Sequence, residues 1–297
     1  MGTVGTVGTV SRAIVEPGAV TTRRVRLFAR ARRSPWALRI GLGIVTIYLA
    51  VAVFAPWLAP YDPLAQDVMH SLAPPSAEHL LGTDSLGRDL LSRLIYGARI
   101  DLLLGAAATG LALILGTVLG LLAGYFRGWV DLVLSRLVDM MMAIPAYPLL
   151  VLLLFLLGQG TGSIILAFAV TGWVSYARLT RGQVMVVREQ DYVVAARLGA
   201  LGNLRVMARH VLPNVTTQVI VLWASDIVLA ISAIAALGYL GIGIQAPTPE
   251  WGVMVADGQG FLLTNWMLAT VPGLVIVVLG VGLALISDSL AARGGRR

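Results

Sequence analysis

Six long apolar runs constrain the fold of this 297-residue chain more than any other feature. Hydrophobic residues make up 58% of the sequence and charged residues only 12%, whereas a soluble domain carries about 25% charged residues. A helix needs about 20 apolar residues to cross roughly 30 Å of hydrocarbon, and most of the runs reach this length. The sequence therefore predicts an all-α integral membrane protein with six transmembrane helices. The expected spans are residues 40–59, 102–126, 132–157, 163–177, 215–240 and 266–286.

The positions of the arginines predict how these spans are oriented. All 22 basic residues of the chain are arginine. With the N-terminus in the cytoplasm, 19 of them fall in cytoplasmic segments and three, Arg88, Arg93 and Arg99, fall outside. Because cytoplasmic loops carry the excess of basic residues, we expect both termini and residues 178–213 in the cytoplasm. Residues 60–101 and 241–265 are then expected to form outer loops.

The two ends of the chain are expected to be tails around a membrane core of residues 40–290. Residues 1–39 begin with a threefold Gly-Thr-Val repeat and contain eight arginines without a core-forming pattern, which predicts a flexible or disordered basic cytoplasmic tail. Residues 291–297 form a second cytoplasmic tail. The net charge of +7 does not indicate nucleic-acid binding, because the arginines flank apolar spans and do not form a soluble basic face.

The cytoplasmic loop at residues 178–213 is a candidate docking element. It contains six arginines and is longer than a simple connection between spans requires. Within it, residues 192–201 have the pattern of a short amphipathic helix. The loop ends at Pro213, which suits the first turn of a following helix because proline has no backbone N–H to leave unpaired.

Two patterns within the spans predict helix geometry. Gly116, Gly120 and Gly124 recur at four-residue spacing, which favours close packing of the second span on another helix. Pro145 and Pro148 predict a kink or local unwinding in the third span, since proline removes a helical hydrogen bond. The fourth span is short, and its helix is expected to continue beyond the bilayer surface.

Asp226 is the most informative charged residue within a span. It lies 13 residues beyond Pro213, which is about 20 Å along a helix and near the middle of the bilayer. A carboxylate facing lipid there would be costly, so Asp226 is expected to face the bundle interior or a water-filled cavity. Two interpretations remain open: a pathway-lining anion that meets a cationic group of a cargo molecule, and a hydrogen-bonded carboxyl group filling a helix interface. Arg136 and Asp139 are expected to form a local ion pair.

The sequence lacks the common catalytic and metal-binding patterns. The absence of cysteine excludes disulfides and thiolate ligands, and the absence of lysine excludes a phosphate-binding loop of the GxxxxGK[ST] type. The acidic residues of the first outer loop and the three histidines do not have the spacing of a calcium loop or a zinc motif. We therefore expect neither enzymatic activity nor a metal or cofactor site in this chain.

The 178–213 loop resembles the EAA loop of ABC-importer membrane subunits, in which a short coupling helix docks into a groove of an ATPase subunit. Counted back from the family's terminal Leu-Pro, the Glu-Ala-Ala motif falls at Val194 and the two alanines after it, and the motif's glycine falls at Ala200. Val194 and Ala200 thus depart from the family pattern, and Arg197 is either a docking residue or part of a solvated face. The resemblance implies ATPase coupling for Tyr192, Val194, Ala195, Ala196, Arg197, Gly199, Ala200, Gly202, Leu212 and Pro213.

Two further stretches resemble the C-type subunit of dipeptide, oligopeptide and nickel importers. They are LGTDSLGRDLLSRLIYGAR at residues 81–99 and LGYLGIGIQAPTPEWG at residues 237–252. Together with the EAA-like loop between them, they extend the resemblance from about residue 40 to the end of the chain. The outer-loop signature of the family falls on Gly82, Thr83, Asp84, Gly87, Arg88 and Asp89.

This resemblance implies the six-helix type I ABC-importer fold in the cytoplasmic membrane of a prokaryote. It also implies a sister permease, two ATPase subunits that bind ATP and Mg²⁺, and an extracytoplasmic substrate-binding protein. The expected cargo is short peptides, with nickel or another small solute as the alternative. A proton-coupled secondary transporter with Asp226 as its carrier carboxylate is a further alternative, although neither inverted repeats nor a second central acid is visible in the sequence.

Overall fold

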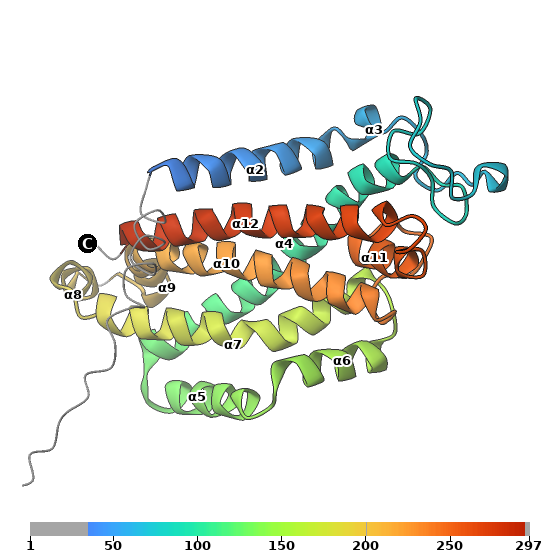
Figure 1. Cartoon of the computed structure of the whole chain (residues 1–297). Helices are drawn as coiled ribbons and strands as arrows, with labels where there is room; N and C mark the ends of the chain where they lie inside the picture. The colour runs from blue at the N-terminus through green and yellow to red at the C-terminus, as the bar shows by residue number, and fades with distance from the viewer. Residues whose placement is uncertain (1–34, 200, 295–297) are drawn as a thin grey trace, which may run out of the picture.

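The computed structural model describes residues 35–199 and 201–294, which form an elongated bundle of helices (Figure 1). No β-strand occurs within these two ranges, and an isolated bridge joins Thr83 to Asp89. The expected all-α class is therefore confirmed. Residues 1–34 of the predicted N-terminal tail lie outside the described residues, so their flexibility remains a prediction. The predicted tail boundary at residue 39 is wrong, because residues 35–39 form the first turn of a helix.

The helices differ widely in length, from single turns to a helix of 37 residues. In chain order they are α2 (Pro35–Val53), α3 (Ala55–Leu58), η1 (Val68–His70), α4 (Leu90–Phe126), α5 (Gly128–Met142), α6 (Ala146–Leu157), α7 (Thr161–Val187), α8 (Asp191–Leu198), α9 (Asn203–Val206), η2 (Met207–Val211), α10 (Leu212–Tyr239), α11 (Trp251–Gln259) and α12 (Met267–Gly294).

Five of these helical runs are long and apolar enough to cross a membrane, and α5 with α6 makes a sixth candidate. These two helices meet at an angle of 89°. The predicted kink is thus a complete break: α5 ends at Met142, and Pro145 has an extended backbone at the N-cap of α6. Pro148 then occupies the first turn of α6, where its missing N–H leaves no helical bond unmade.

Several helices extend beyond the limits predicted from hydropathy. The helix α4 begins at Leu90, well before the expected residue 102, because Asp89 caps it by accepting a hydrogen bond from the Ser92 backbone N–H. The helix α7 continues to Val187, as predicted for the short fourth span. The helix α12 runs to Gly294, so the beginning of the predicted C-terminal tail is helical.

The glycine seam of α4 packs against α7, and this pair makes the most extensive helix contact in the bundle. A Cβ atom at Gly124 would lie 2.8 Å from the Arg181 carbonyl oxygen, and Gly116 and Gly120 approach the α7 backbone even more closely. The small residues therefore allow the two backbones to approach closely, as the spacing predicted.

The loops gather at two opposite ends of the bundle, as Figure 1 shows. One end, here called the α8 end, holds α8, α9, the start of α2 and the end of α12. The other, here called the α11 end, holds α3, η1 and α11. The segments that the arginines place on the cytoplasmic side thus share one end of the molecule, and the predicted outer loops share the other.

Candidate functional site

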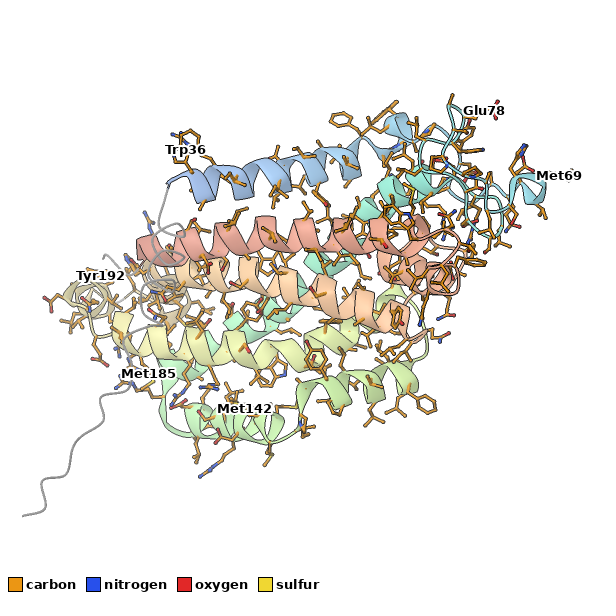
Figure 2. All side chains as sticks on the ribbon, viewed as in Figure 1. Trp36, Met69, Glu78, Met142, Met185 and Tyr192 are labelled. Atoms are coloured by element: carbon orange, nitrogen blue, oxygen red, sulfur yellow. The ribbon has the colours of Figure 1, made fainter. Side chains whose placement is uncertain are left out.

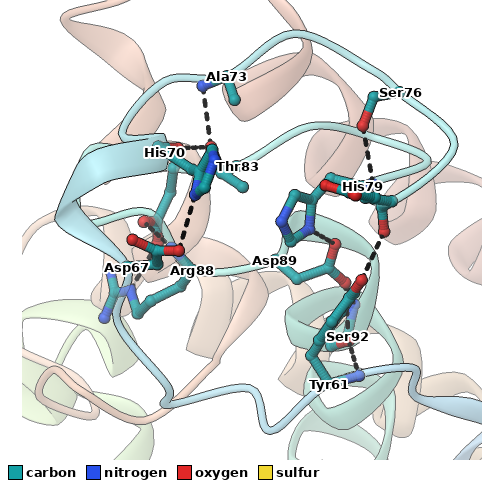
Figure 3. A network of polar contacts seen from close by, with 12 residues as sticks. Tyr61, Asp67, His70, Ala73, Ser76, His79, Thr83, Arg88, Asp89 and Ser92 are labelled. Atoms are coloured by element: carbon teal, nitrogen blue, oxygen red, sulfur yellow. Dashed lines mark hydrogen bonds and ion pairs between the residues drawn. The ribbon is translucent and has the colours of Figure 1, made fainter.

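The outer-loop signature (residues 82–89) forms a compact network of polar contacts at the α11 end, here called the knot of polar contacts, and Figure 3 shows part of it. Gly82 and Gly87 have φ values of 79° and 74°, and a side chain at Gly87 would overlap the backbone of Asp67. Asp84 Oδ1 accepts a hydrogen bond of 3.0 Å from the Arg88 backbone N–H. These glycines are thus required by the turn, because φ values in this range disfavour other residues.

Asp89 and Thr83 close the knot and connect it to α4. Asp89 Oδ2 accepts hydrogen bonds of 2.7 Å from both the backbone N–H and the hydroxyl of Ser92, and Asp89 Oδ1 lies 2.9 Å from His79 Nδ1. The hydroxyl of the fully buried Thr83 donates to the His70 carbonyl group. The polar groups of the signature therefore cap the N-terminus of α4 and hold the two sides of the outer loop together.

Buried ion pairs join this knot to α11. Arg88 Nε lies 2.6 Å from Asp84 Oδ2, and Arg88 Nη2 lies 3.6 Å from Asp257 Oδ2. Arg93 Nε lies 3.5 Å from Asp84 Oδ2. Burial raises the pKa of Asp257, while the nearby Arg93 and Arg88 act in the opposite direction. Of the three arginines predicted as outer charges, Arg88 and Arg93 are buried structural cations and only Arg99 is exposed.

A pair of buried carboxyl groups links α4 to α11. Asp101 and Glu250 interact directly, and both are almost completely buried. Glu250 accepts backbone hydrogen bonds through both oxygens, from Gly252 at 2.7 Å and Val253 at 2.8 Å, whereas Asp101 accepts one of 3.1 Å from Trp251. Two neighbouring carboxylates do not both stay ionised in such a site. Asp101 accepts fewer hydrogen bonds than Glu250, and its Oδ1 has no partner of ordinary hydrogen-bond geometry among the described residues, so we expect Asp101 to hold the proton.

Asp226 is part of the lining of an open cavity of about 230 Å³ between the helices. Asp226 therefore faces a cavity, as its cost in lipid predicted, and α4, α6, α7 and α10 all contribute to the walls. The polar lining residues are Thr109, Thr171, Ser175, Tyr176 and Asp226. Ala146, Tyr147 and Leu150 line the side formed by α6, directly after the break in the third span.

The polar groups around Asp226 are only partly paired. The buried Tyr176 hydroxyl interacts with the Asp226 carboxyl group, although this contact does not have ordinary hydrogen-bond geometry. Trp223 Nε1 donates a hydrogen bond of 3.0 Å to the Thr109 hydroxyl, which itself donates to the Gly105 carbonyl at 2.7 Å. The cavity thus offers a hydroxyl group and a carboxylate between apolar walls.

A second cavity of about 410 Å³ opens between α4, α5 and α7. Arg181 from its wall donates a hydrogen bond of 2.7 Å to Asp131, which fastens α7 to α5. Arg178 Nη1 lies 3.1 Å from Met142 Sδ at the end of α5. The predicted ion pair between Arg136 and Asp139 is present at 4.0 Å on the exposed side of α5.

The α8 end contains the predicted coupling helix. The helix α8 spans Asp191–Leu198, so the predicted end at residue 201 is wrong: Gly199 terminates the helix three residues earlier. The helix is amphipathic as predicted, with Val193 fully buried and Tyr192 and Leu198 exposed by 46% and 83%. Figure 2 shows Tyr192 at this end of the bundle.

The other residues predicted for coupling occupy several environments. Val194 is 37% exposed, Ala196 packs partly against the buried cluster, and Ala200 lies outside the described residues. The remaining residues of the set are Ala195, Gly199, Gly202 and Pro213, which are exposed, and Leu212, which is half-buried.

Pro213 lies in the first turn of α10, as predicted, but no loop precedes this helix. The helical run starts at Asn203, passes through the π-helical turn Met207–Val211 and continues into α10. A π turn widens the backbone directly before the proline, which cannot donate to the preceding turn. The predicted 178–213 loop is therefore mostly helical, and its described non-helical positions are residues 188–190, 199, 201 and 202.

Arg197 contacts the ring of Tyr125, a residue for which the sequence predicted no function. Its guanidinium carbon lies 5.9 Å from the centre of the Tyr125 ring, at the end of α4. Tyr125, Arg188, Asn203 and the Asp101–Glu250 pair were all missed by sequence reasoning. A carboxylate at Asp101 beside an apolar run was a usable signal, whereas nothing in the sequence pairs Tyr125 with residues 63 to 78 positions later.

A bundle with five or six candidate membrane spans, a mainly apolar cavity that contains a carboxyl group, and a short exposed helix at one end is typical of a multi-pass transport permease. The chain belongs to the family of binding-protein-dependent transport system inner membrane components, which it matches over residues 116–297. Residues 24–75 match the N-terminal transmembrane domain of oligopeptide transport permease C. The predicted family is therefore confirmed.

The chain is also similar to several characterised relatives along most of its length. It is 43% identical to the di/tripeptide transport system permease protein DppC of Pseudomonas aeruginosa, over 84% of both chains. It is 40% identical to the dipeptide permease DppC of Haemophilus influenzae, over 84% of this chain and 87% of the relative. The corresponding protein of Alkalihalophilus pseudofirmus is 37% identical, over 89% of this chain and 86% of the relative.

Proposed function

We propose that this chain is the permease subunit of an ATP-driven importer that carries short peptides across the cytoplasmic membrane of a prokaryote. The observation that carries the proposal is the similarity of 84–89% of the chain to permeases named for dipeptides and tripeptides. The relatives described above are named for peptides and not for nickel, which favours peptide cargo over the nickel alternative.

The permease works with other subunits in this proposal. A sister permease completes the pathway, a substrate-binding protein delivers the cargo outside, and two ATPase subunits bind ATP and Mg²⁺ in the cytoplasm. The lysine-free sequence supports a separate ATPase, because it excludes a phosphate-binding loop in this chain. The arginine distribution and the shared location of both described ends support a cytoplasmic α8 end.

The exposed surface of α8 is the proposed contact with an ATPase subunit. Val194 stands where the family has glutamate, and with Tyr192 and Leu198 it gives this helix exposed apolar side chains. An amphipathic helix binds a groove through such apolar anchors. We therefore expect this contact to depend on the shape and apolar surface of α8 more than on a carboxylate at position 194.

The cavity around Asp226 is the proposed part of the translocation pathway in this subunit. A carboxylate and the nearby Tyr176 hydroxyl can contact the ammonium group of a passing peptide, while the apolar walls tolerate varied side chains. The walls come from four helices, two of which, α7 and α10, continue toward α8. A change in the tilt of these helices would therefore change the shape of the cavity.

Uptake by the complete importer in proteoliposomes tests the function. In vesicles whose ATPase subunits face the lumen, we expect a labelled dipeptide to accumulate only when ATP is enclosed in the lumen. We expect nickel ions not to accumulate. Uptake that persists without the ATPase subunits would refute the ATP-driven mechanism. Accumulation of nickel without peptide uptake would refute the cargo.

Asp226→Asn tests the role of the cavity. We expect reduced uptake of peptides with a free cationic N-terminus and little change for N-acetylated peptides, since only the former can pair with a carboxylate. Asp139→Asn is the matched control, because it makes the same change on an exposed part of α5 outside this cavity. Unchanged uptake of both peptide types by Asp226→Asn would contradict a role in cargo contact.

A further inference from the structure

Four segments of the chain meet at the side chain of Tyr125, the second-last residue of α4. Its hydroxyl donates a hydrogen bond of 3.0 Å to Asn203 Oδ1 at the start of α9. The guanidinium carbons of Arg188 and Arg197 lie 6.0 Å and 5.9 Å from the centre of its ring. Tyr125 is only 5% exposed, so these contacts form in a setting where cation–π attraction is stronger than in open solvent.

A second set of contacts joins the same places through the backbone and Glu189. Arg188 Nη1 donates to the Tyr125 carbonyl oxygen, which is one of the unpaired carbonyls at the end of α4. Glu189 lies 2.8 Å from Arg127 and 3.3 Å from Arg188. The segment directly before α8 is therefore fastened to the junction between α4 and α5.

The helix α8 has few other attachments to the bundle. It has eight residues, and Val193 is its one fully buried side chain. Val193 belongs to a buried cluster that also contains Tyr125, Val184 and Val206. A helix this short has little stability of its own, so contacts at Tyr125 determine much of how α8 is held.

We infer that Tyr125 is a positioning residue that fixes α8 to the α4–α5 junction, so that a displacement of α8 moves α4 and α5 as well as α7 and α10. The inference rests on the proposed function of α8 as the ATPase contact. It adds a connection that the chain order does not supply, since α8 is covalently continuous only with the segments leading to α7 and α10.

This connection reaches the central cavity by two routes. Thr109 lines the cavity from α4, 16 residues before Tyr125, which is about 24 Å along one rigid helix. The helix α5 leads through the 89° break to Ala146 and Tyr147 of α6, which line the same cavity. A packed junction with discrete contacts can pass a movement between such elements.

Distances between introduced spin labels test whether α8 and the α4–α5 junction move together. The chain has no cysteine, so Asp191→Cys at the start of α8 and Trp129→Cys at the start of α5 supply unique label sites in this chain, and both side chains are exposed. In the complete importer, we expect the distance between them to stay the same with and without ATP. In a Tyr125→Leu background, we expect this distance to broaden and to change when ATP binds.

Uptake per ATP hydrolysed provides the second measurement. We expect Tyr125→Leu to lower this ratio by roughly fivefold to tenfold, and Tyr125→Phe, which keeps the ring and loses only the Asn203 bond, to lower it by less than threefold. Phe155→Leu is the matched control, because it removes an 80% exposed aromatic ring of α6, whereas Phe126 packs edge-on against Tyr125 with ring centres 5.3 Å apart. If Tyr125→Leu does not assemble, Arg188→Gln removes one ring contact and the bond to the Tyr125 carbonyl group, and it is expected to reduce the ratio in the same direction.

The outcomes separate this inference from the proposed function. A wild-type importer without ATP-dependent uptake would refute both. ATP-dependent uptake, combined with a wild-type label distance that changes with ATP or with a normal ratio in Tyr125→Leu, would refute the role of Tyr125 alone.

Discussion

Replacing Gly97 with alanine should disturb the packing of α11 on α4. Gly97 lies under Trp251, and a Cβ atom there would be 2.6 Å from both Cδ1 and Nε1 of the indole ring. Favourable carbon–carbon contacts lie at about 3.5 Å, so the ring or the helix would have to move by roughly 0.9 Å. Trp251 cannot turn away easily, because it is fully buried, its Nε1 donates to the Leu94 carbonyl at 3.1 Å, and its backbone N–H donates to Asp101 at 3.1 Å.

The expected cost follows from these constraints. Overpacking a well-packed core costs about 1–3 kcal/mol, and the better helix propensity of alanine returns up to about 1 kcal/mol. We therefore expect Gly97→Ala to lose about 1–2 kcal/mol of stability and to lower the thermal unfolding midpoint by roughly 2–8 °C. The midpoint can be measured by tryptophan fluorescence of the purified protein in lipid nanodiscs.

Gly110→Ala is the matched control for this prediction. Gly110 lies on the same helix, and nothing is within 4 Å of a Cβ atom built there. We expect this variant to be as stable as the wild type or slightly more stable, since only the propensity changes. Equal midpoints for Gly97→Ala and Gly110→Ala would refute the argument from close packing. A Gly97→Ala/Trp251→Phe double variant that loses less than the sum of its single changes would support the direct contact.

The remaining predictions concern the polar groups at the α11 end. Asp101→Asn should retain wild-type stability, because its amide can donate to Glu250 in place of the shared proton, whereas Asp101→Ala should lose about 1–3 kcal/mol; similar midpoints for the two variants would contradict this assignment. The buried pair keeps its proton to a higher pH than the unfolded chain does, because two neighbouring buried carboxyl groups do not both ionise. Wild-type stability should therefore fall as the pH rises through the range in which the pair loses this proton, and Asp101→Asn should weaken this dependence. Arg88→Gln should lose about 1.5–3 kcal/mol, because it removes the shorter of two arginine contacts to the buried Asp84 and leaves Arg93 as the remaining cation, while the exposed Arg99→Gln should change the midpoint little.

The apolar runs and special residues were sufficient to predict the class and much of the local geometry. Hydropathy identified the spans, the glycine spacing of α4 indicated its close contact with another helix, and Pro145 marked the break in the third span. These features are local, because they depend on helix periodicity and on the backbone chemistry of individual residues. The expectation that Asp226 faces a cavity also followed from local chemistry, since its carboxylate is costly in lipid.

Other features depend on which segments the fold brings together. Leu90 starts α4 early because Asp89 and Ser92 form a cap within a folded loop. The Asp101–Glu250 pair joins residues 149 positions apart, and Tyr125 meets Asn203 across 78 positions.

By itself, the sequence thus determined the membrane class, the family and the side chains available for chemistry. Only the tertiary structure decided which of these side chains share a buried environment. Hydropathy reports how much of a segment avoids water, but a hydrogen bond or an ion pair depends on distances that only helix packing sets.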